Sequence, residues 1–239
     1  MNIRIKIIQF LIGLNENIFF YPKLSTFYKQ NKLKNDNPIL IFDIGANKGQ
    51  SIDFFLKLYK NVIIYAFEPN PKLYKKIEKK YRNKKNIFIY NLGVSNLNGQ
   101  LELKETVTDE TSTFENLNYN SEYLNLKAKI LGVKKEKIVN KKYYVNVIRL
   151  SDFLQKESIK KINILKIDTE GHELKCLLGL SNENFSSIDL IQLESHEDDM
   201  YLSNDSKSEI INLLNSNGYK KCTEIKHGFG DFKECIYEK

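Results

Sequence analysis

Apolar runs and amphipathic segments alternate along the first part of the chain. Residues 39–44 and 62–67 are short, nearly continuous apolar runs that are typical of buried strands. Each run is followed by a segment with apolar residues at helical spacing, which predicts helices over about 50–59 and 71–81. The two helical stripes are Ile52, Phe55, Leu56 and Tyr59, and Leu73, Tyr74, Ile77 and Tyr81. The order strand, helix, strand, helix predicts a parallel sheet.

Similar patterns continue to the C-terminus and predict an α/β fold with seven strands in all. The further strands are expected at 87–90, 162–167, 188–194, 219–225 and 232–237. Between the third and fourth of the seven strands, a hairpin arm at 100–104 and a strand at 143–150 show alternating patterns. Residues 206–214 have the spacing of a helix.

Two segments depart from this regular pattern. Residues 1–36 mix Ile, Leu and Phe with Lys and Asn. We predict that they form an N-terminal helical extension, which covers the sheet or joins two subunits of a homo-oligomer, and that 37–239 form the main domain. Residues 105–142 lose strong periodicity, and a long segment of this kind often covers a binding site. We therefore predict an insertion that covers a binding site, with a helix at 122–133; the alternative is a surface insertion without a role.

The end of the first strand has the features of a cofactor-binding turn. Gly45 and Gly49 have no Cβ, so they can take positive φ and let a ligand approach the backbone. Glu68 ends the second strand about 20 residues later, where doubly wound folds place a carboxylate on ribose hydroxyls. The turn lacks the Gly-x-Gly-x-x-Gly pattern, and Asp43 would repel a pyrophosphate. This favours a cofactor that carries a positive charge over NAD.

Acidic residues close several of the predicted strands. In a parallel sheet the ligand lies at the carboxyl ends of the strands, and four acids fall at such ends: Asp43, Glu68, Asp168 and Glu194. Carboxylates gathered at one edge need cations or hydroxyls nearby, or their pKa values would rise. A cofactor that carries a cation would supply positive charge.

An ordered set of motifs resembles the class I S-adenosylmethionine methyltransferases, and specifically the FkbM-type O-methyltransferases. The similarity runs from about residue 39 to the C-terminus. The motifs are Asp43-x-Gly45-x-Asn47-x-Gly49, Phe67-Glu68-Pro69, Asn91-Leu-Gly93-Val-Ser95, Leu150-Ser-Asp152, Leu165-Lys-Ile-Asp168-Thr-Glu170-Gly171-His-Glu173 and Ile188-Asp-Leu-Ile-Gln-Leu-Glu194. The resemblance implies a doubly wound, mostly parallel seven-stranded sheet with an antiparallel edge strand.

The resemblance also implies a cofactor and a reaction. S-adenosylmethionine would be bound by Asp43, Gly45, Ala46, Asn47, Gly49, Glu68, Pro69, Gly93, Val94 and Asp168. Its methyl group would pass to a hydroxyl, which we expect on a sugar of a surface glycan or of its nucleotide-linked precursor. The resemblance also implies that residues 105–142 cover this acceptor. The alternatives are a small acceptor that is not a sugar and a module that binds the cofactor or a partner without catalysis.

Three residues are candidates for the catalytic site. Methyl transfer to oxygen is an in-line displacement, in which a base helps only if it reaches the hydroxyl. His196 follows the fifth strand and is our candidate base; the alternative is a solvent-exposed loop histidine. Asp168 and Glu170 follow the fourth strand and are expected at the methyl-transfer site, although an acid such as Asp168 could also cap a helix.

Other polar residues have structural interpretations. We interpret His172 as a residue at a helix start, and His227 beside Gly228 and Gly230 as part of a turn. Oxygen ligands for Mg²⁺ could come from Asp168, Glu194, His196, Asp198 and Asp199. The Asp-Asn pair of catechol-type O-methyltransferases is missing after the fifth strand, so we do not expect a metal.

Composition and charge indicate the cellular compartment and the class of partner. A chain of 239 residues with 41% hydrophobic residues can bury a full core, and no uncharged apolar run reaches the roughly 18 residues of a membrane span. The net charge of +7 is concentrated between residues 72 and 85, which we interpret as a solvated helix face. Asp168-Thr-Glu-Gly replaces the motif expected of a nucleic-acid N-methyltransferase. Three scattered cysteines suit a reducing compartment, so we expect a cytoplasmic enzyme that does not act on nucleic acid.

Overall fold

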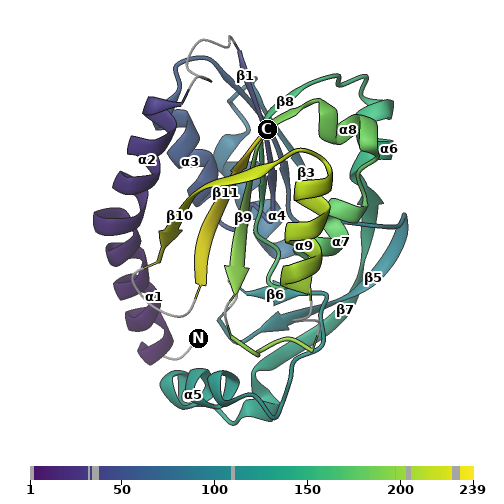
Figure 1. The fold of residues 1–239 in the computed structure, drawn as a ribbon. Coiled ribbons are helices and arrows are strands. Elements are labelled where there is room, and N and C mark those ends of the chain that lie inside the picture. Colours follow the sequence, from purple (N-terminus) through teal and green to yellow (C-terminus); the bar gives the residue numbers. More distant parts are fainter. Residues whose placement is uncertain are drawn as a thin grey trace.

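The computed structural model describes residues 3–31, 33, 38–108, 111–196, 198–202, 206–227 and 232–239. A central sheet is covered by helices on both faces, and a smaller sheet lies beside it (Figure 1). The element types and most of their bounds agree with the prediction from the sequence. The predicted α/β fold with seven strands and a mostly parallel sheet is confirmed.

The central sheet has the strand order β10-β11-β9-β8-β1-β2-β3. Its strands are β1 (Ile39–Ile44), β2 (Val62–Phe67), β3 (Ile87–Tyr90), β8 (Ile162–Ile167), β9 (Ile188–His196), β10 (Lys220–Lys226) and β11 (Phe232–Glu238). β11 is antiparallel to both β9 and β10, so the antiparallel strand is inserted next to the edge and β10 forms the edge itself. This insertion brings residues of the C-terminal strand to the carboxyl end of β9.

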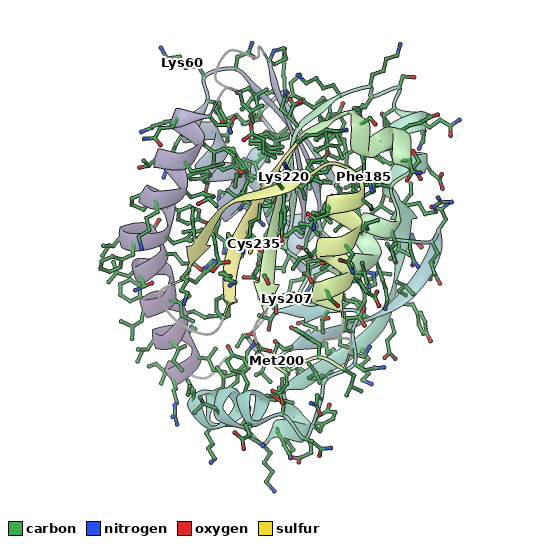
Figure 2. The ribbon with its side chains drawn as sticks, in the orientation of Figure 1. Lys60, Phe185, Met200, Lys207, Lys220 and Cys235 are labelled. Carbon is green, nitrogen blue, oxygen red and sulfur yellow. The ribbon has the colours of Figure 1, made fainter. Side chains whose placement is uncertain are left out.

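Alternation along the strands directs side chains into two apolar layers. On one face, Ile41 and Ile64 pack against α2 (Tyr21–Gln30), α3 (Gln50–Leu58) and α4 (Pro71–Tyr81). On the other face, Phe42 and Phe67 pack in a layer that includes Phe185 (Figure 2). The helices of this second layer are α6 (Leu150–Lys156), α7 (Glu173–Leu178), α8 (Asn182–Ser186) and α9 (Ser206–Ser216).

The N-terminal extension is one uninterrupted helical stretch rather than two separate helices. It comprises α1 (Ile3–Asn15), a π-helical turn η1 (Glu16–Phe20) and α2. Phe20, Leu24 and Tyr28 recur at every fourth position and are buried against the sheet layer of α3. The extension therefore packs on its own domain along α2, whereas most of α1 projects beyond the sheet (Figure 1).

The predicted insertion contains more regular structure than its sequence suggested. A second sheet of order β4-β7-β5-β6 is formed by β4 (Gly93–Ser95), β5 (Gly99–Thr106), β6 (Ser112–Thr113) and β7 (Val139–Arg149). A helix, α5 (Glu122–Leu131), and a short 3₁₀ turn, η3 (Lys135–Lys137), lie between β6 and β7. The first half of β7 is exposed on both faces, so it lacks the alternation by which a half-buried strand is recognised.

Candidate functional site

The glycine turn after β1 is pressed against the loop that follows β8. Gly45 has a φ of +85°, and a Cβ at this position would overlap the carbonyl oxygen of Asp168. Gly49 has a φ of +80°, and a Cβ there would lie 2.7 Å from the hydroxyl oxygen of Tyr81. Both positions therefore need glycine for conformation and for space. The carboxyl ends of β1 and β8 are held together as a result.

Asp43 lies beneath this turn rather than on its surface. Its carboxylate is fully buried and accepts a hydrogen bond from the Ser51 hydroxyl at 2.5 Å. The ammonium nitrogen of Lys166 is 3.6 Å from the other carboxylate oxygen. Burial raises the pKa of Asp43, while Lys166 and Ser51 act against that rise. Asp43 thus supports the turn from below.

Glu68 connects the glycine turn to the end of β2. One carboxylate oxygen accepts the backbone N–H of Asn47 and the other that of Asn70, each at 2.8 Å. Burial raises the pKa of Glu68 to about 7, although both N–H groups lower it. The side-chain amide of Asn91 donates to the backbone carbonyls of Glu68 and Pro69. The predicted contact between Glu68 and ribose remains a prediction, because the structure shows only these internal contacts.

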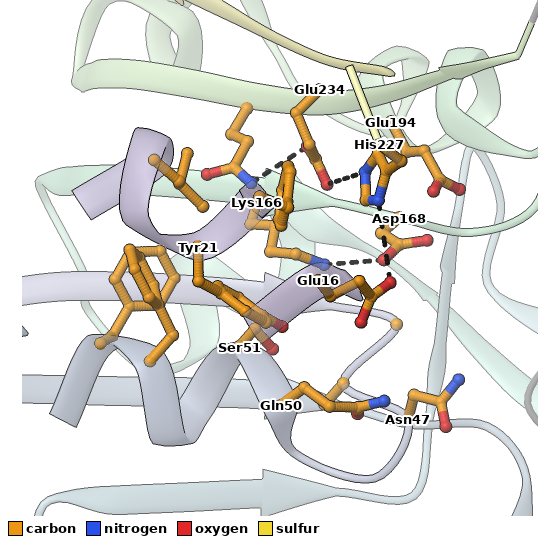
Figure 3. A pocket seen from close by; sticks show the side chains of 17 residues that line it. Glu16, Tyr21, Asn47, Gln50, Ser51, Lys166, Asp168, Glu194, His227 and Glu234 are labelled. Atoms are coloured by element: carbon orange, nitrogen blue, oxygen red, sulfur yellow. Dashed lines mark hydrogen bonds and ion pairs between the residues drawn. The ribbon is translucent and has the colours of Figure 1, made fainter. Parts of the chain in front are cut away.

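A cavity of about 100 Å³ lies beside the glycine turn, between the N-terminal helix and the carboxyl ends of the strands (Figure 3). This volume is several times what one water molecule needs. The lining residues are Glu16, Phe20, Tyr21, Leu24, Gly45, Ala46, Asn47, Gln50, Ser51, Phe54, Phe55, Lys166, Asp168, Gln192, Glu194, His227 and Glu234. Of the predicted cofactor residues, the structure brings Gly45, Ala46, Asn47 and Asp168 to this cavity.

Lys166 is a charged residue in the middle of the sheet, and the sequence analysis assigned it no role. Its ammonium lies 3.0 Å from a carboxylate oxygen of Asp168, and its side chain is 9% exposed. Burial opposes ionisation of Asp168, but Lys166 outweighs it and holds the pKa of Asp168 below its usual value. Burial would also lower the pKa of Lys166, yet Asp168 and Asp43 raise it. The pair is therefore ionised at neutral pH.

His227 lines the cavity, so the interpretation of this histidine as a turn residue was incomplete. Its ring stacks on Phe20 with 4.1 Å between centroids, and its two nitrogens lie 3.7 Å from Glu16 and 3.8 Å from Glu234 (Figure 3). Burial lowers the pKa of His227, but the two carboxylates reverse this and raise it to about 10. The two carboxylates therefore favour the protonated form of His227. The neighbouring Gly228 and Gly230 lie outside the described residues.

A chain of buried hydrogen bonds extends from the cavity to the N-terminal helix. The Tyr28 hydroxyl donates to the side-chain oxygen of Gln192, and the amide of Gln192 donates to Glu234 at 3.0 Å. Glu234 is paired in register with Glu194 across β11 and β9. Gln192 and Glu234 were missed in the sequence, because only the pairing of β11 with β9 reveals where they lie.

The loop after β8 is stabilised by its own side chains. A single carboxylate oxygen of Glu173 accepts the backbone N–H groups of Thr169 and Gly171 and the hydroxyl of Thr169. Glu170 has a positive φ of 55°, and its carboxylate accepts a hydrogen bond from Tyr201 at 2.7 Å. Glu170 does not line the cavity, so its predicted catalytic role remains a prediction.

His172 joins this loop to the second sheet. As predicted, it lies at the start of a helix, α7, but it is 2% exposed and carries contacts that the sequence did not indicate. Its Nδ1 lies 2.6 Å from a carboxylate oxygen of Glu115, and its Nε2 lies 3.0 Å from the Ser95 hydroxyl. Lys175 contacts the same oxygen of Glu115 at 2.7 Å. Burial would raise the pKa of Glu115, but these two basic groups lower it to about 2.

Gly93 and Val94, which were predicted to bind the cofactor, lie in β4 of the second sheet. A Cβ at Gly93 would be 2.7 Å from the ring of Phe114, so the glycine permits close packing there. Val94 is buried in the apolar layer, and its carbonyl accepts a hydrogen bond from the Cys176 thiol. Neither residue lines the cavity, and their packing accounts for both residue types.

The candidate base and metal ligands lie around the end of β9. The backbone of His196 ends β9, but its side chain lies outside what the structure describes. Asp198 accepts the backbone N–H of Met200, and Asp199 accepts the hydroxyl of Ser121, which caps α5. Within the described part of the chain, no three acidic, histidine or cysteine side chains form a group that could hold a metal ion.

A second cavity of about 100 Å³ lies across β9 from the first, and Glu194 lines both. It is enclosed by the loop after β8, the helix α9 and the strands β9, β10 and β11. Its lining combines two tyrosines with three lysines and two glutamates. These and the remaining lining residues are Gly171, Glu173, Leu193, Glu194, Ser195, Tyr201, Lys207, Ile210, Ile211, Lys221, Lys233, Cys235 and Tyr237.

Comparison with protein-family models gives a match over most of the chain. Residues 43–221 match the family described as the methyltransferase FkbM domain. A curated relative, Methyltransferase 1 of Beauveria bassiana (strain ARSEF 2860), is 27% identical over 167 residues. This alignment covers 64% of the present chain and 63% of the relative, so the chain spans less than two thirds of the relative's length.

Solved structures show the same fold. The crystal structure of the methyltransferase FkbM from Methylobacillus flagellatus KT has a TM-score of 0.57 at 13% identity, and covers 90% of this chain and 47% of its own. Magnesium protoporphyrin IX methyltransferase from Synechocystis PCC 6803, with bound S-adenosylmethionine, has a TM-score of 0.50 at 10% identity. That match covers 95% of this chain and 79% of the other.

Proposed function

From the premise that this chain belongs to the FkbM methyltransferase family, we propose that it transfers the methyl group of S-adenosylmethionine to a hydroxyl. The observation that carries the proposal is the charge of the cavity beside the glycine turn. Four carboxylates line it against two cationic side chains, Lys166 and His227. S-adenosylmethionine carries a sulfonium and an ammonium against one carboxylate, so its net positive charge complements the negative excess.

The residues around the cavity fit this cofactor. Gly45, Ala46 and Asn47 line the cavity, and the positive φ of Gly45 and Gly49 shapes the turn that would hold the ligand. Asp168 is kept ionised by Lys166 and can hold an ammonium group. Glu68 would receive the ribose hydroxyls on the lone pairs that its two backbone contacts leave available.

Bound S-adenosylmethionine supplies an electrophilic methyl group, and the chain must orient a hydroxyl in line with it. The Gly45–Asp168 contact fixes the distance between the two loops that surround the cofactor site. His196, at the end of β9, remains our proposed base for the hydroxyl proton. Its place on the strand next to β8 supports this assignment.

We propose that the acceptor hydroxyl belongs to a sugar of a surface glycan or of its nucleotide-linked precursor. The resemblance to O-methyltransferases supports the sugar, and the second cavity supports its chemistry. Tyrosine rings and carboxylates suit a polyhydroxy compound, and lysines suit the phosphates of a nucleotide-linked form. We place the reaction in the cytoplasm, which the three unpaired cysteines support.

Calorimetric titration of the protein with S-adenosylmethionine tests the cofactor part of the proposal. We expect micromolar binding to the wild type and binding about tenfold weaker to Glu68→Gln, because a neutral amide cannot accept two hydroxyl donors as well as a carboxylate does. Glu78→Gln is the matched control, since the exposed Glu78 carboxylate accepts a hydrogen bond from Tyr74 on α4 and does not line the cavity. No binding to the wild type would leave a partner-binding module as the alternative.

Methylation assays with labelled cofactor then test the acceptor. Nucleotide sugars, polysaccharide fragments and simple phenols should be compared in parallel. Methylation of phenols alone would contradict the sugar assignment without affecting the cofactor site. His196→Ala should lower turnover and leave the cofactor affinity unchanged, and an unchanged rate would remove His196 as the base.

A further inference from the structure

The outer face of α1 exposes an unusual number of large apolar side chains. Phe10 is 70% exposed and Ile3 is 75% exposed. Seven residues of α1 and η1 share this property: Ile3, Ile7, Phe10, Leu11, Leu14, Ile18 and Phe19. A single exposed apolar side chain is ordinary, but a contiguous apolar patch marks a surface that meets a protein or a membrane.

The exposed side chains of α1 form a stripe. Ile3, Ile7, Phe10 and Leu14 follow one another at intervals of three and four residues, so they lie on one side of the helix. The opposite side of α1 carries Ile5, which is buried. The apolar stripe therefore does not face the core.

Helix α5 lies beside the N-terminal end of α1. The guanidinium of Arg4 donates to the carbonyl of Lys129 at 3.3 Å, and the side chain of Gln9 donates to the carbonyl of Thr108. These contacts place the first turns of α1 beside α5, as Figure 1 shows. Helix α5 exposes Leu126 by 55% and Ile130 by 47%. We call the exposed apolar residues of α1, η1 and α5 the apolar face.

The helices that carry the apolar face have an excess of basic residues. The only charged residues of α1 are Arg4 and Lys6, which lie on opposite sides of the apolar stripe at 3.6 residues per turn. In the segment from α5 to η3, residues 122–137, the acids are Glu122 and Glu136. The bases of this segment are Lys127, Lys129, Lys134, Lys135 and Lys137. A face with this combination suits a partner that is apolar inside and anionic at its surface.

The charges decide between the two obvious occupants. In a symmetric dimer the same patch meets itself, so the basic rim of one subunit would face the basic rim of the other. A bilayer with anionic lipids offers hydrocarbon to the stripe and negative charge to the lysines. We propose that the apolar face docks the protein on the surface of an anionic membrane.

Docking of this kind is compatible with the position of the helix. No helix among the described residues is long and apolar enough to cross a membrane, and α1 would lie in the plane of the interface instead. The same helical stretch lines the cofactor cavity with Glu16 and Phe20. Docking would therefore bring the membrane surface to the catalytic end of the sheet, but binding itself does not depend on methyl transfer.

Sedimentation of the full chain with vesicles tests the proposal. We expect binding to vesicles of equal parts phosphatidylglycerol and phosphatidylcholine, much weaker binding to phosphatidylcholine alone, and weakening by added salt. Phe10→Asp should lower the binding constant at least about tenfold, because a phenyl ring no longer enters the bilayer. Lys6→Gln should lower it about fivefold.

Tyr144→Asp is the matched control for Phe10→Asp. Tyr144 is 69% exposed on β7 of the second sheet. The Tyr144→Asp variant should bind vesicles like the wild type. Calorimetry with S-adenosylmethionine and thermal unfolding verify that each variant is folded. The proposal is overturned by absent binding to the anionic vesicles, by equal binding to both compositions, or by equal losses in Phe10→Asp and Tyr144→Asp. A dimer that Phe10→Asp dissociates, without vesicle binding, would identify a second copy as the occupant.

Discussion

Two charged clusters lie at the carboxyl end of the central sheet, and they differ in how their charges balance. In the cluster around Glu115, one carboxylate oxygen meets His172 and Lys175, and Ser95 completes the contacts of the histidine. None of these residues lines either cavity. In the cavity cluster, four carboxylates share Lys166 and His227, and empty volume adjoins them.

The difference in charge balance distinguishes residues that stabilise the fold from residues that are suited to bind a ligand. A buried charge is costly unless it is paired, so a cluster that balances within the protein needs nothing more. An excess of one sign beside a cavity is stabilised when a ligand of the opposite sign binds. The Glu115 cluster therefore fixes the second sheet to the loop after β8, and the cavity cluster favours a cationic cofactor.

The sharpest way to test the comparison is to remove the buried cation of the cavity. Lys166→Met leaves Asp43 and Asp168 without their shared partner, so we expect a loss of about 3–5 kcal/mol in the free energy of unfolding. Urea denaturation measures it. The corresponding change in the other cluster, Lys175→Met, removes a cation that is 44% exposed and should cost less than about 1 kcal/mol.

Restoring the balance should restore stability. In the double variant Asp43→Asn with Lys166→Met, one buried carboxylate is removed together with the cation, and we expect part of the lost stability to return. If Lys166→Met were as stable as Lys175→Met, Lys166 would not be the partner that keeps these acids ionised.

The two clusters should also lose stability at opposite ends of the pH range. His227 holds its proton more tightly when folded, with a pKa of about 10 against 6.5, so its contribution is complete below pH 6.5 and is lost as the pH rises towards 10. Glu115 has a pKa of about 2 against 4.5, so its contribution is present above pH 4.5 and is lost as the pH falls towards 2. At about 1.4 kcal/mol per pKa unit, these shifts correspond to about 5 kcal/mol for His227 and about 3 kcal/mol for Glu115.

Variants assign each limb of the pH profile to its cluster. His227→Phe keeps a ring to stack on Phe20 but carries no charge, so its stability should change less than that of the wild type between pH 6.5 and 10. Glu115→Gln should flatten the acid limb and leave the alkaline limb intact. A wild-type alkaline limb that persists in His227→Phe would show that other groups produce it.

The central fold could be predicted from the sequence because its strands are buried and its helices are amphipathic. The apolar run before Asp43 indicates a buried strand, and the stripe through Ile52 and Phe55 indicates a helix that packs on it. The second sheet was underestimated for the opposite reason. The start of β7 is exposed at residues 140–142 and pairs with β5, so it leaves no apolar period in the sequence.

Part of the cavity lining could be predicted from the sequence, and the rest depends on which strands pair in the folded protein. Residues at the ends of parallel strands, such as Asp168, must meet at one edge, so their order in the chain was sufficient. Glu234 and His227 reach the cavity only because β11 inserts antiparallel beside β9. Lys166 did leave a signal, since a lysine inside the apolar run 162–167 must find a buried partner.

The last prediction concerns His172, which lies within the motif 165–173 but belongs to the balanced cluster. His172→Ala removes two hydrogen-bond partners and leaves Glu115 with Lys175 alone, so the free energy of unfolding should fall by about 1–3 kcal/mol. Because His172 does not line the cavity, the affinity for S-adenosylmethionine should stay within about twofold of the wild type under conditions where the variant is folded. Urea denaturation and calorimetry measure the two quantities on the same sample. A large loss of affinity with unchanged stability would show that His172 helps to bind the cofactor rather than to stabilise the fold. The distinction between the two clusters would then be wrong.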